Sequence, residues 1–395
     1  MPPKRHLALA AAVAVSALVA WTSVDPLDAG ADTTLTVTTP LPAWAAPRAV
    51  LRIRGRTAPE VPVALFIGER RRSTTSGARG GFRFRVRAPR EPGRYAVFVA
   101  AEGARVALGV LRVRPLLLAA VGDVTFGDGV LTAIRAHGAR YPWHSVASVL
   151  RSADLAVANL EGAVSRRGAP WPGKLYTFRG PPRALRAAAY YAGVDVVSVA
   201  NNHSLDYGRT AFLDTIRHAR RFGVAPVGGG ADLRRARRPA LVTRGNVRVA
   251  FLGFSDVRPL GFDAGATTPG ATPAFPEYIR ADVRRARRRA DVVVAYFHWG
   301  IERATRPNAR QRSLARTALD AGAHVVLGAH PHVLQPIRHR GNRLVAWSLG
   351  NFVFAAHSPG TERTGILRIR LGARGVLSFG FRRARIHGVQ PRLLR

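Results

Sequence analysis

Polar residues that can bind metal ions stand at the ends of several apolar runs in this chain. The endings are Gly122-Asp123, Asn159-Leu160-Glu161, Asn201-Asn202-His203, His298-Trp299-Gly300-Ile301-Glu302, His330-Pro331-His332 and Ser348-Leu349-Gly350-Asn351. Open α/β sheets place ligands at the carboxyl ends of their strands, so these side chains converge if the runs are strands of shared sheets. Carboxylate, amide and imidazole groups suit Zn, Mn or Fe(II). The sequence therefore predicts a divalent metal site of one or two ions.

Each ending taken alone has a structural alternative. A lone histidine after a strand is often a hydrogen-bonded turn residue, and Asp123 after a glycine could equally begin a helix as its N-cap. His330 and His332 are the stronger signal, because alternate residues of an extended segment point the same way. Pro331 favours an extended backbone at His330. The number of such endings in one chain favours a metal site over separate polar caps.

Two residues beside His298 are expected to contribute to the same site. Trp299 is predicted to line the pocket wall. Glu302 either binds the site directly or accepts a hydrogen bond from His298 and so orients it. The remaining histidines have no paired polar residue at a strand end, and we expect them on the surface or in packing: His137, His144, His218, His324, His339, His357 and His387.

The elements that must position these residues alternate between strands and helices. Apolar runs are found at 116–124, 153–161, 194–203, 248–256, 290–300, 323–332 and 343–354, with helix-like segments between several of them, at 182–193, 210–223 and 309–323. Continuous apolar strands indicate that both sheet faces are covered. This pattern predicts a layered α/β domain over residues 115–395, with late strands at 365–371 and 375–386.

Residues 32–114 have a different pattern. Six short alternating runs are separated by Gly, Pro and Ser every 8–12 residues or so, which is the spacing of a small β-sandwich. In the segment RFRVR, Phe84 lies on one face with Phe82 and Val86, and arginines lie on the other. No polar constellation is present here, so we expect a spacer or adhesion module.

The first 31 residues are predicted to direct export. Basic residues precede LALAAAVAVSALVAW at 7–21, a run of fifteen apolar or small residues. A membrane span needs about 20 such residues, so the run favours a secretory signal peptide, with a short membrane anchor as the alternative. In both cases we expect the rest of the chain outside the cytoplasm.

The composition limits the chemistry. The chain has 395 residues, no cysteine and a formal net charge of +38. Thiolate ligands, disulfides and a cysteine nucleophile are therefore excluded. The charge comes almost entirely from arginine, since lysine occurs only at positions 4 and 174. An anionic polymer or lipid is one explanation, and a general preference for arginine over lysine is the other. No nucleic-acid motif accompanies the charge, so no specific nucleic acid is expected.

Several motifs together resemble the CapA family, capsule-synthesis proteins linked to poly-γ-glutamate and distantly similar to calcineurin-like metallophosphatases. The motifs are GDVTFG (122–127), ADLAVANLEGAVS (153–165), VDVVSVANNHSLDYG (194–208), VVAYFHWGIE (293–302), GAHVVLGAHPHVLQPI (322–337) and WSLGNFVF (347–354). The resemblance covers roughly residues 116–356. It implies a metallophosphatase-like four-layer α/β/β/α sandwich, which here follows the small β-sandwich.

The resemblance also implies roles for individual residues. The metal ligands would be Asp123, Glu161, Asn202, His298, His330 and His332, with His203 as the proton donor or acceptor. Asp206 or Glu302 could orient His203, and Asn159, Asn201 and Asn351 would support the site. Two departures from the distant superfamily concern its chemistry: its first motif is Asp-x-His but position 125 is Thr, and its second motif normally carries Asp but is here Asn-Leu-Glu.

These observations predict an exported protein that acts in synthesis or export of an anionic capsule polymer. Its partners would be that polymer or a phosphorylated or lipid-linked precursor, and other capsule subunits at the membrane. Two alternatives remain open. One is a metal-dependent phosphoesterase without a link to capsule, and the other is a non-catalytic subunit that binds the polymer.

Overall fold

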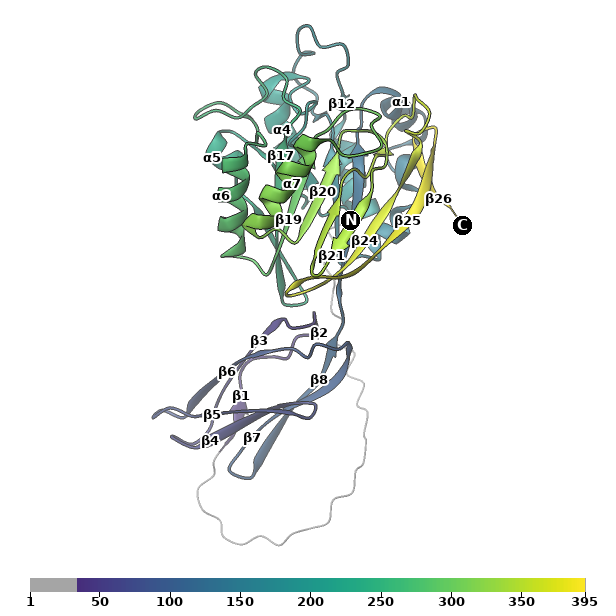
Figure 1. Ribbon diagram of the computed structural model, residues 1–395. Helices are drawn as coiled ribbons and strands as arrows, with labels where there is room; N and C mark the ends of the chain where they lie inside the picture. Colours follow the sequence, from purple (N-terminus) through teal and green to yellow (C-terminus); the bar gives the residue numbers. More distant parts are fainter. Residues whose placement is uncertain (1–33, 395) are drawn as a thin grey trace. The chain divides into compact units, whose positions relative to one another are not determined.

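The computed structural model describes residues 34–394, which form two compact units (Figure 1). The first comprises Leu51–Val86 and Arg94–Arg112 together with the described residues up to Ala43. The second comprises Trp44–Val50, Arg87–Gly93 and the chain from Val113 onward. Two segments of the range expected to form the small module, 44–50 and 87–93, thus cluster with the larger unit.

The predicted export segment, 1–31 with its apolar run 7–21, lies outside the described residues. Within 34–394, no helix combines the length and the apolar character needed to cross a membrane.

The first unit is all-β, as the alternation predicted. One sheet has the order β1-β3-β6, from Thr36–Val37, Val50–Arg56 and Gly81–Arg87. The other contains β8-β7-β4-β5, from Ala104–Val113, Gly93–Ala101, Pro62–Ile67 and Arg70–Thr75. Phe82 and Phe84 of β6 are buried while Arg83 and Arg85 between and beside them are exposed. The period of two therefore separates a packed face from a solvated one.

The larger unit is built on two sheets. The first has eight strands in the order β14-β13-β10-β9-β24-β25-β26, with β23 also paired to β9. Their bounds are Ala225–Val227, Val196–Ser198, Leu155–Leu160, Leu116–Val124, Arg363–Gly372, Gly375–His387, Gln390–Leu393 and, for β23, Asn351–Val353. Strands β9, β10, β13, β14 and β23 are parallel to their neighbours in this group. Their carboxyl ends therefore share one edge.

The second sheet has six strands in the order β16-β17-β19-β20-β22-β21. Their bounds are Ala240–Arg244, Val247–Ser255, Val292–His298, Val325–Ala329, Arg343–Ala346 and Ile337–Arg340. The four inner strands are parallel, and the two edge strands are antiparallel to them. Residues of β17, β19 and β20 are almost wholly apolar and buried, which explains their continuous apolar runs.

Helices cover the outer face of each sheet (Figure 1). The eight-stranded sheet packs against α1 (Asp128–His137), η1 (Tyr141–Trp143), α2 (Ala147–Arg151), α3 (Pro182–Ala187), η2 (Ala188–Ala192) and α4 (Gly208–Arg221). The six-stranded sheet packs against α6 (Pro276–Arg287) and α7 (Ala309–Ala321). Tyr296 of β19 donates a hydrogen bond from its hydroxyl to the carbonyl of Val121 in β9, at 2.7 Å, and so links the two sheets. The order is helices, sheet, sheet, helices, which confirms the predicted four-layer sandwich.

Short elements complete the unit: β2 (Trp44–Ala45), the pair β11 (Ala163–Val164) and β12 (Arg179–Gly180), the pair β15 (Gly229–Gly230) and β18 (Gly270–Ala271), and α5 (Leu233–Ala236). The ends of the parallel strands of both sheets, and the loops that follow them, carry the polar endings seen in the sequence. In the register, Asp123 lies beside Asn159 and Asn351, and His298 lies beside Ala329. The fold thus brings the endings to one region.

Candidate metal centre

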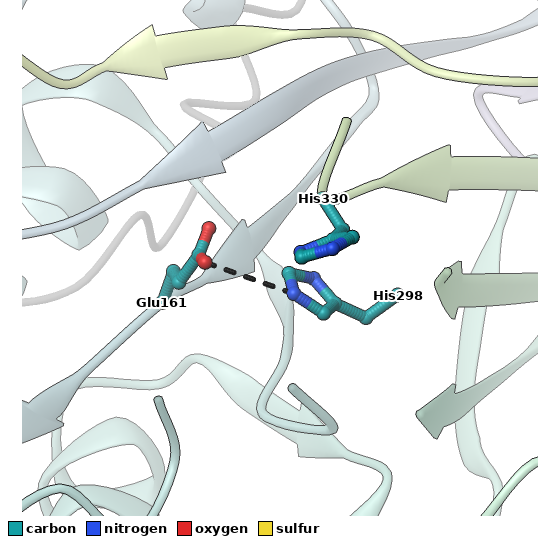
Figure 2. Close-up of side chains that lie close together, drawn as sticks. All are labelled: Glu161, His298 and His330. Atoms are coloured by element: carbon teal, nitrogen blue, oxygen red, sulfur yellow. Dashed lines mark ion pairs between the residues drawn. The ribbon is translucent and has the colours of Figure 1, made fainter. Parts of the chain in front are cut away.

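Glu161, His298 and His330 point toward one another from three separate strand ends (Figure 2). One ligand atom from each lies within 4.8 Å of the others, and the same limit holds for Asp123, Glu161 and His332. The Glu161 Oε1 and His298 Nε2 atoms are 3.7 Å apart, and both side chains are fully buried. Asn202 joins this cluster because its Oδ1 lies 2.7 Å from His298 Nε2. The structure therefore gathers all six predicted ligands, although their role as ligands stays a prediction.

The cluster contains buried polar atoms that nothing in residues 34–394 satisfies. Both carboxylate oxygens of Glu161 and the Nδ1 atom of His330 have no hydrogen-bond partner there. A buried polar group without a partner costs about 1–3 kcal/mol, and a charged one costs more. A divalent cation would supply the missing partner to both residues. The residues therefore fit a metal ion bound by oxygen and nitrogen.

Burial shifts the protonation of these groups in the protein without metal. Burial, followed by the nearby charge of Asp123, raises the pKa of Glu161 well above its usual value. Burial lowers the pKa of His330 to about 3 and that of His298 well below its usual value, and neighbouring imidazoles add to both shifts. Neutral imidazoles offer a lone pair to a metal.

His332 behaves differently from the other two imidazoles. Burial alone would lower its pKa, but the hydrogen bond to Asp123 and the charge of Glu161 outweigh this and raise it to about 10. Its Nδ1 lies 3.4 Å from Asp123 Oδ2 and 2.8 Å from Asn351 Oδ1. Without metal, His332 is therefore protonated, and its imidazolium provides the positive charge beside Asp123 and Glu161.

Two asparagines hold the acidic and imidazole groups in place. Asn159 donates from Nδ2 to Asp123 Oδ1 at 2.8 Å and lies 3.2 Å from His298 Nδ1. Asn201 donates to Asn159 Oδ1 at 3.2 Å and to the carbonyl of Leu160 at 2.8 Å. Both asparagines are buried, so this chain of amides links the ends of β10 and β13 to the cluster.

His203 and Asp206 form a pair at the edge of the cluster. His203 Nδ1 lies 2.7 Å from Asp206 Oδ2, and its Nε2 lies 3.9 Å from Glu161 Oε1. The ring stacks on Phe178 with the centroids 4.3 Å apart. Burial, opposed by Asp206, lowers the pKa of His203. An Nδ1–H that donates to Asp206 leaves the Nε2 lone pair directed toward Glu161.

Lys174 was not predicted as a site residue. Its Nζ donates to Asp206 Oδ1 and to the carbonyl of Asn202, and it lies 3.0 Å from His203 Nδ1. The sequence contained a signal, because Lys174 is the sole lysine between positions 34 and 394 in a chain that otherwise uses arginine. Its distance in sequence from the NNH motif concealed the contact.

The backbone at the HPH motif corrects one part of the sequence argument. His330 has φ +94° and His332 has φ +58°, so this segment is not extended as the proline suggested. Non-glycine residues rarely adopt such angles. The left-handed turn still directs both rings to the cluster, where their centroids are 5.8 Å apart.

Of the two predicted neighbours of His298, Trp299 lies away from the site, whereas Glu302 lies close to it. Trp299 is fully buried in the core under α6 and α7, stacks on Phe297 and donates from Nε1 to the carbonyl of Trp347 at 2.9 Å. It does not line the site, because consecutive strand residues point to opposite faces and His298 takes the site side. Glu302 is exposed, and its carboxylate lies within 4.8 Å of ligand atoms of His330 and His332.

Thr125 stands where the distant superfamily has a histidine. It is buried, and its Oγ1 accepts a hydrogen bond from the backbone N–H of Gly127 at 3.2 Å. Thr125 therefore shapes the turn before α1, and the ligand set lacks that histidine.

Comparisons with known proteins agree on one family. The sequence model described as "Bacterial capsule synthesis protein PGA_cap" matches residues 117–356. The chain is 34% identical to the PGA biosynthesis protein CapA of Bacillus subtilis over 276 residues, which is 69% of this chain and 72% of that protein. It is 30% identical to the capsule biosynthesis protein CapA of Bacillus anthracis, over 66% of this chain and 65% of that protein.

Among solved structures, a putative 5'-nucleotidase from Staphylococcus aureus aligns with 70% of this chain and 53% of its own. The sequence identity is 14% and the TM-score is 0.42.

Proposed function

We propose that this chain, which belongs to the family of bacterial capsule synthesis proteins, acts in synthesis or export of an anionic capsule polymer. Relatives in this family carry names that refer to capsule or PGA biosynthesis. The net charge of +38 supports an anionic partner, since it favours polymers rich in carboxylate or phosphate.

We further propose that this cluster binds a divalent metal and is the functional site of the protein. The observation that carries this is the buried Glu161 carboxylate, whose two oxygens have no hydrogen-bond partner among the described residues although His298 and His203 surround it. One or two ions of Mn, Zn or Fe would be held by Asp123, Glu161, Asn202, His298, His330 and His332. A bound divalent metal polarises phosphoryl or carbonyl oxygens and lowers the pKa of water.

A second candidate function, hydrolysis of a phosphorylated or lipid-linked precursor, has its own observation. His203 is oriented at Nδ1 by Asp206 and directs Nε2 into the cluster. A pocket that only binds polymer has no need of an imidazole oriented in this way. His203 would move a proton at Nε2 to or from the reacting group, while Asp206 holds the ring in one tautomer.

The proposed location is outside the cytoplasm, secreted or anchored through residues 7–21. The support is the sequence of that apolar run, which has basic residues before it. Other capsule subunits at the membrane would be its protein partners.

Metal analysis and two release assays test these proposals on the purified full-length chain. We expect bound Mn, Zn or Fe, and release of phosphate from phosphorylated precursors or of glutamate from poly-γ-glutamate that stops with chelator. Bound metal with no release from either substrate class would contradict hydrolysis and favour a polymer-binding subunit. Phosphate release from simple phosphate esters without any effect on capsule formation would favour a general phosphoesterase.

Two variants separate metal binding from proton transfer. His332→Ala should lower the metal content and the activity together. His203→Ala should keep the metal and lower kcat by about 10²- to 10⁴-fold, the usual contribution of a positioned acid or base. Full activity in both variants would exclude the catalytic proposal.

A further inference from the structure

The segment 171–178 is attached to Asp206 at three points. The backbone N–H of Trp171 donates to the carbonyl of Asp206 at 2.7 Å, and the backbone N–H of Phe178 donates to its Oδ2 at 2.6 Å. Between these two, Lys174 donates to Oδ1. Asp206 is fully buried, and the Lys174 side chain is only 17% exposed. The segment therefore encloses the carboxylate that orients His203.

The ammonium of Lys174 also reaches the residues on either side of this pair. It donates to the carbonyl of Asn202 and lies 3.0 Å from His203 Nδ1, while its other side faces the ring of Phe262 at 5.2 Å. His203 Nδ1 is closer to Asp206 Oδ2, at 2.7 Å, so Nδ1–H donates to the carboxylate and not to the ammonium. Lys174 thus fixes the acceptor of that hydrogen bond and the backbone that carries Asn202.

The choice of lysine at this place is specific. The chain contains 59 arginines and two lysines, so arginine is its ordinary cation. An ammonium is compact and directs three N–H groups tetrahedrally, while a guanidinium is a wide planar fork. Lys174 Nζ donates to two separate acceptors, the Asp206 carboxylate and the Asn202 carbonyl, which suits the compact ammonium. A general charge preference does not explain an exception at this buried position.

We propose that Lys174 is a positioning residue for the pair of His203 and Asp206. By fixing both the Asp206 carboxylate and the Asn202 carbonyl, it keeps His203 Nε2 directed at the cluster, a task for which arginine does not substitute. The inference rests on the proposed use of His203 in proton transfer, but the geometry that it claims exists in the protein without metal or substrate.

The first test observes His203 itself. Full-length chain labelled with ¹⁵N in its histidine side chains is studied by NMR in chelator, and the His203 signals are assigned by their loss in His203→Gln. We expect a protected Nδ1–H cross-peak in the unmodified protein. In Lys174→Ala this peak should broaden through exchange with water, and propylammonium, which replaces the lost atoms, should restore it.

Controls show whether the effect belongs to Lys174. Arg166→Ala removes one positive charge from the same loop at an exposed position and should leave the peak unchanged. The signals of buried His324, on the other sheet, report whether each variant is folded. If Lys174→Ala does not fold, Lys174→Met keeps the apolar stem and gives the same comparison.

The second test uses turnover, with metal affinity measured by calorimetry. Lys174→Ala and Lys174→Arg should each lower kcat by about 10- to 100-fold, with KM and metal affinity changed less than about threefold. Propylammonium should recover activity in Lys174→Ala. An unchanged His203 cross-peak in Lys174→Ala would overturn the proposal. An unchanged kcat in Lys174→Arg would overturn it too. If the His203 cross-peak changes in Lys174→Ala but no protein, including the unmodified one, shows turnover, the positioning role is supported. Only the proposal of hydrolysis would then be contradicted.

Discussion

Two carboxylates of the larger unit, Asp282 and Glu161, are equally buried but have opposite surroundings. Asp282 of α6 accepts hydrogen bonds from Arg237 at 2.9 and 3.0 Å and a further one from Arg285. Glu161 has no hydrogen-bond partner in the described chain. At Asp282, two of the many arginines of this chain therefore neutralise a buried carboxylate and stabilise the fold. Within residues 34–394 no arginine pairs with Glu161 and neither of its oxygens has a hydrogen-bond partner, which supports the proposed metal ion as their partner.

Two histidines repeat the same contrast. His324 and His330 are both 5% exposed. His324 Nδ1 accepts a hydrogen bond from the backbone N–H of Val293 at 3.1 Å, while Nδ1 of His330 has no partner in residues 34–394. One imidazole is thus satisfied by the fold, and the other keeps a lone pair for a ligand.

The largest expected effect comes from breaking the satisfied pair. Arg237→Met leaves Asp282 buried with a single exposed partner, and removal of one member of a buried ion pair costs about 3–5 kcal/mol. We expect the free energy of unfolding, measured with urea, to fall by that amount. Arg234→Met, a change at an exposed neighbouring arginine, is the matched control and should have little effect.

The satisfied histidine should make stability depend on pH. Burial lowers the pKa of His324 to about 4, while the unfolded chain titrates near 6.5. As pH falls from about 6.5 to about 4, the unfolded state binds this proton first, so the folded protein loses on the order of 3 kcal/mol. The loss should be absent from His324→Asn when the two unfolding curves are compared. A parallel pH dependence in both proteins would contradict the assignment.

Metal binding should stabilise the protein through Glu161 and His330, which hold buried side-chain atoms without a hydrogen-bond partner in residues 34–394. At a free concentration 100-fold above its Kd, Mn or Zn should raise the free energy of unfolding by about 2.7 kcal/mol. Glu161→Gln and His330→Ala should lose most of this gain. Arg237→Met should keep it, although its starting stability is lower. Equal stabilisation of all variants would show that the metal binds elsewhere.

The smallest expected effect is a gain in stability, whereas Arg237→Met should cause a loss. In chelator, Glu161→Gln removes a buried carboxyl group whose oxygens accept no hydrogen bond from residues 34–394, so it should raise the free energy of unfolding by about 1 kcal/mol. The same substitution at a paired site, Asp282→Asn, should lower it. Destabilisation by Glu161→Gln without metal would mean that Glu161 has a structural partner, and the contrast between the two carboxylates would fail.

Much of the fold followed from the pattern of the sequence. The continuous apolar runs predicted β9, β10, β13, β17, β19 and β20, because strands covered on both faces need no polar alternation. The alternation in 81–87 predicted a strand with one solvated face, which β6 has. The backbone of the HPH motif was not predictable, since proline favours extension locally and only the surrounding packing holds His330 and His332 at positive φ.

The candidate site shows the same division. Asp123, Glu161 and His298 were found because each stands at the end of its own strand or directly after it, and parallel strands end at a common edge. Trp299 was misplaced although the period of two could have excluded it, since His298 and Trp299 cannot face the same side of one strand.

The sequence alone determined which side chains stand at strand ends and what ligands they offer, because both follow from local order along the chain. Only the tertiary structure decided that two separate sheets bring their edges together, that the Glu161 oxygens have no hydrogen-bond partner within residues 34–394, and that Lys174 reaches Asp206 from a distant loop. These are contacts between segments far apart in the chain, and their partners depend on how the two sheets pack, which no local pattern encodes.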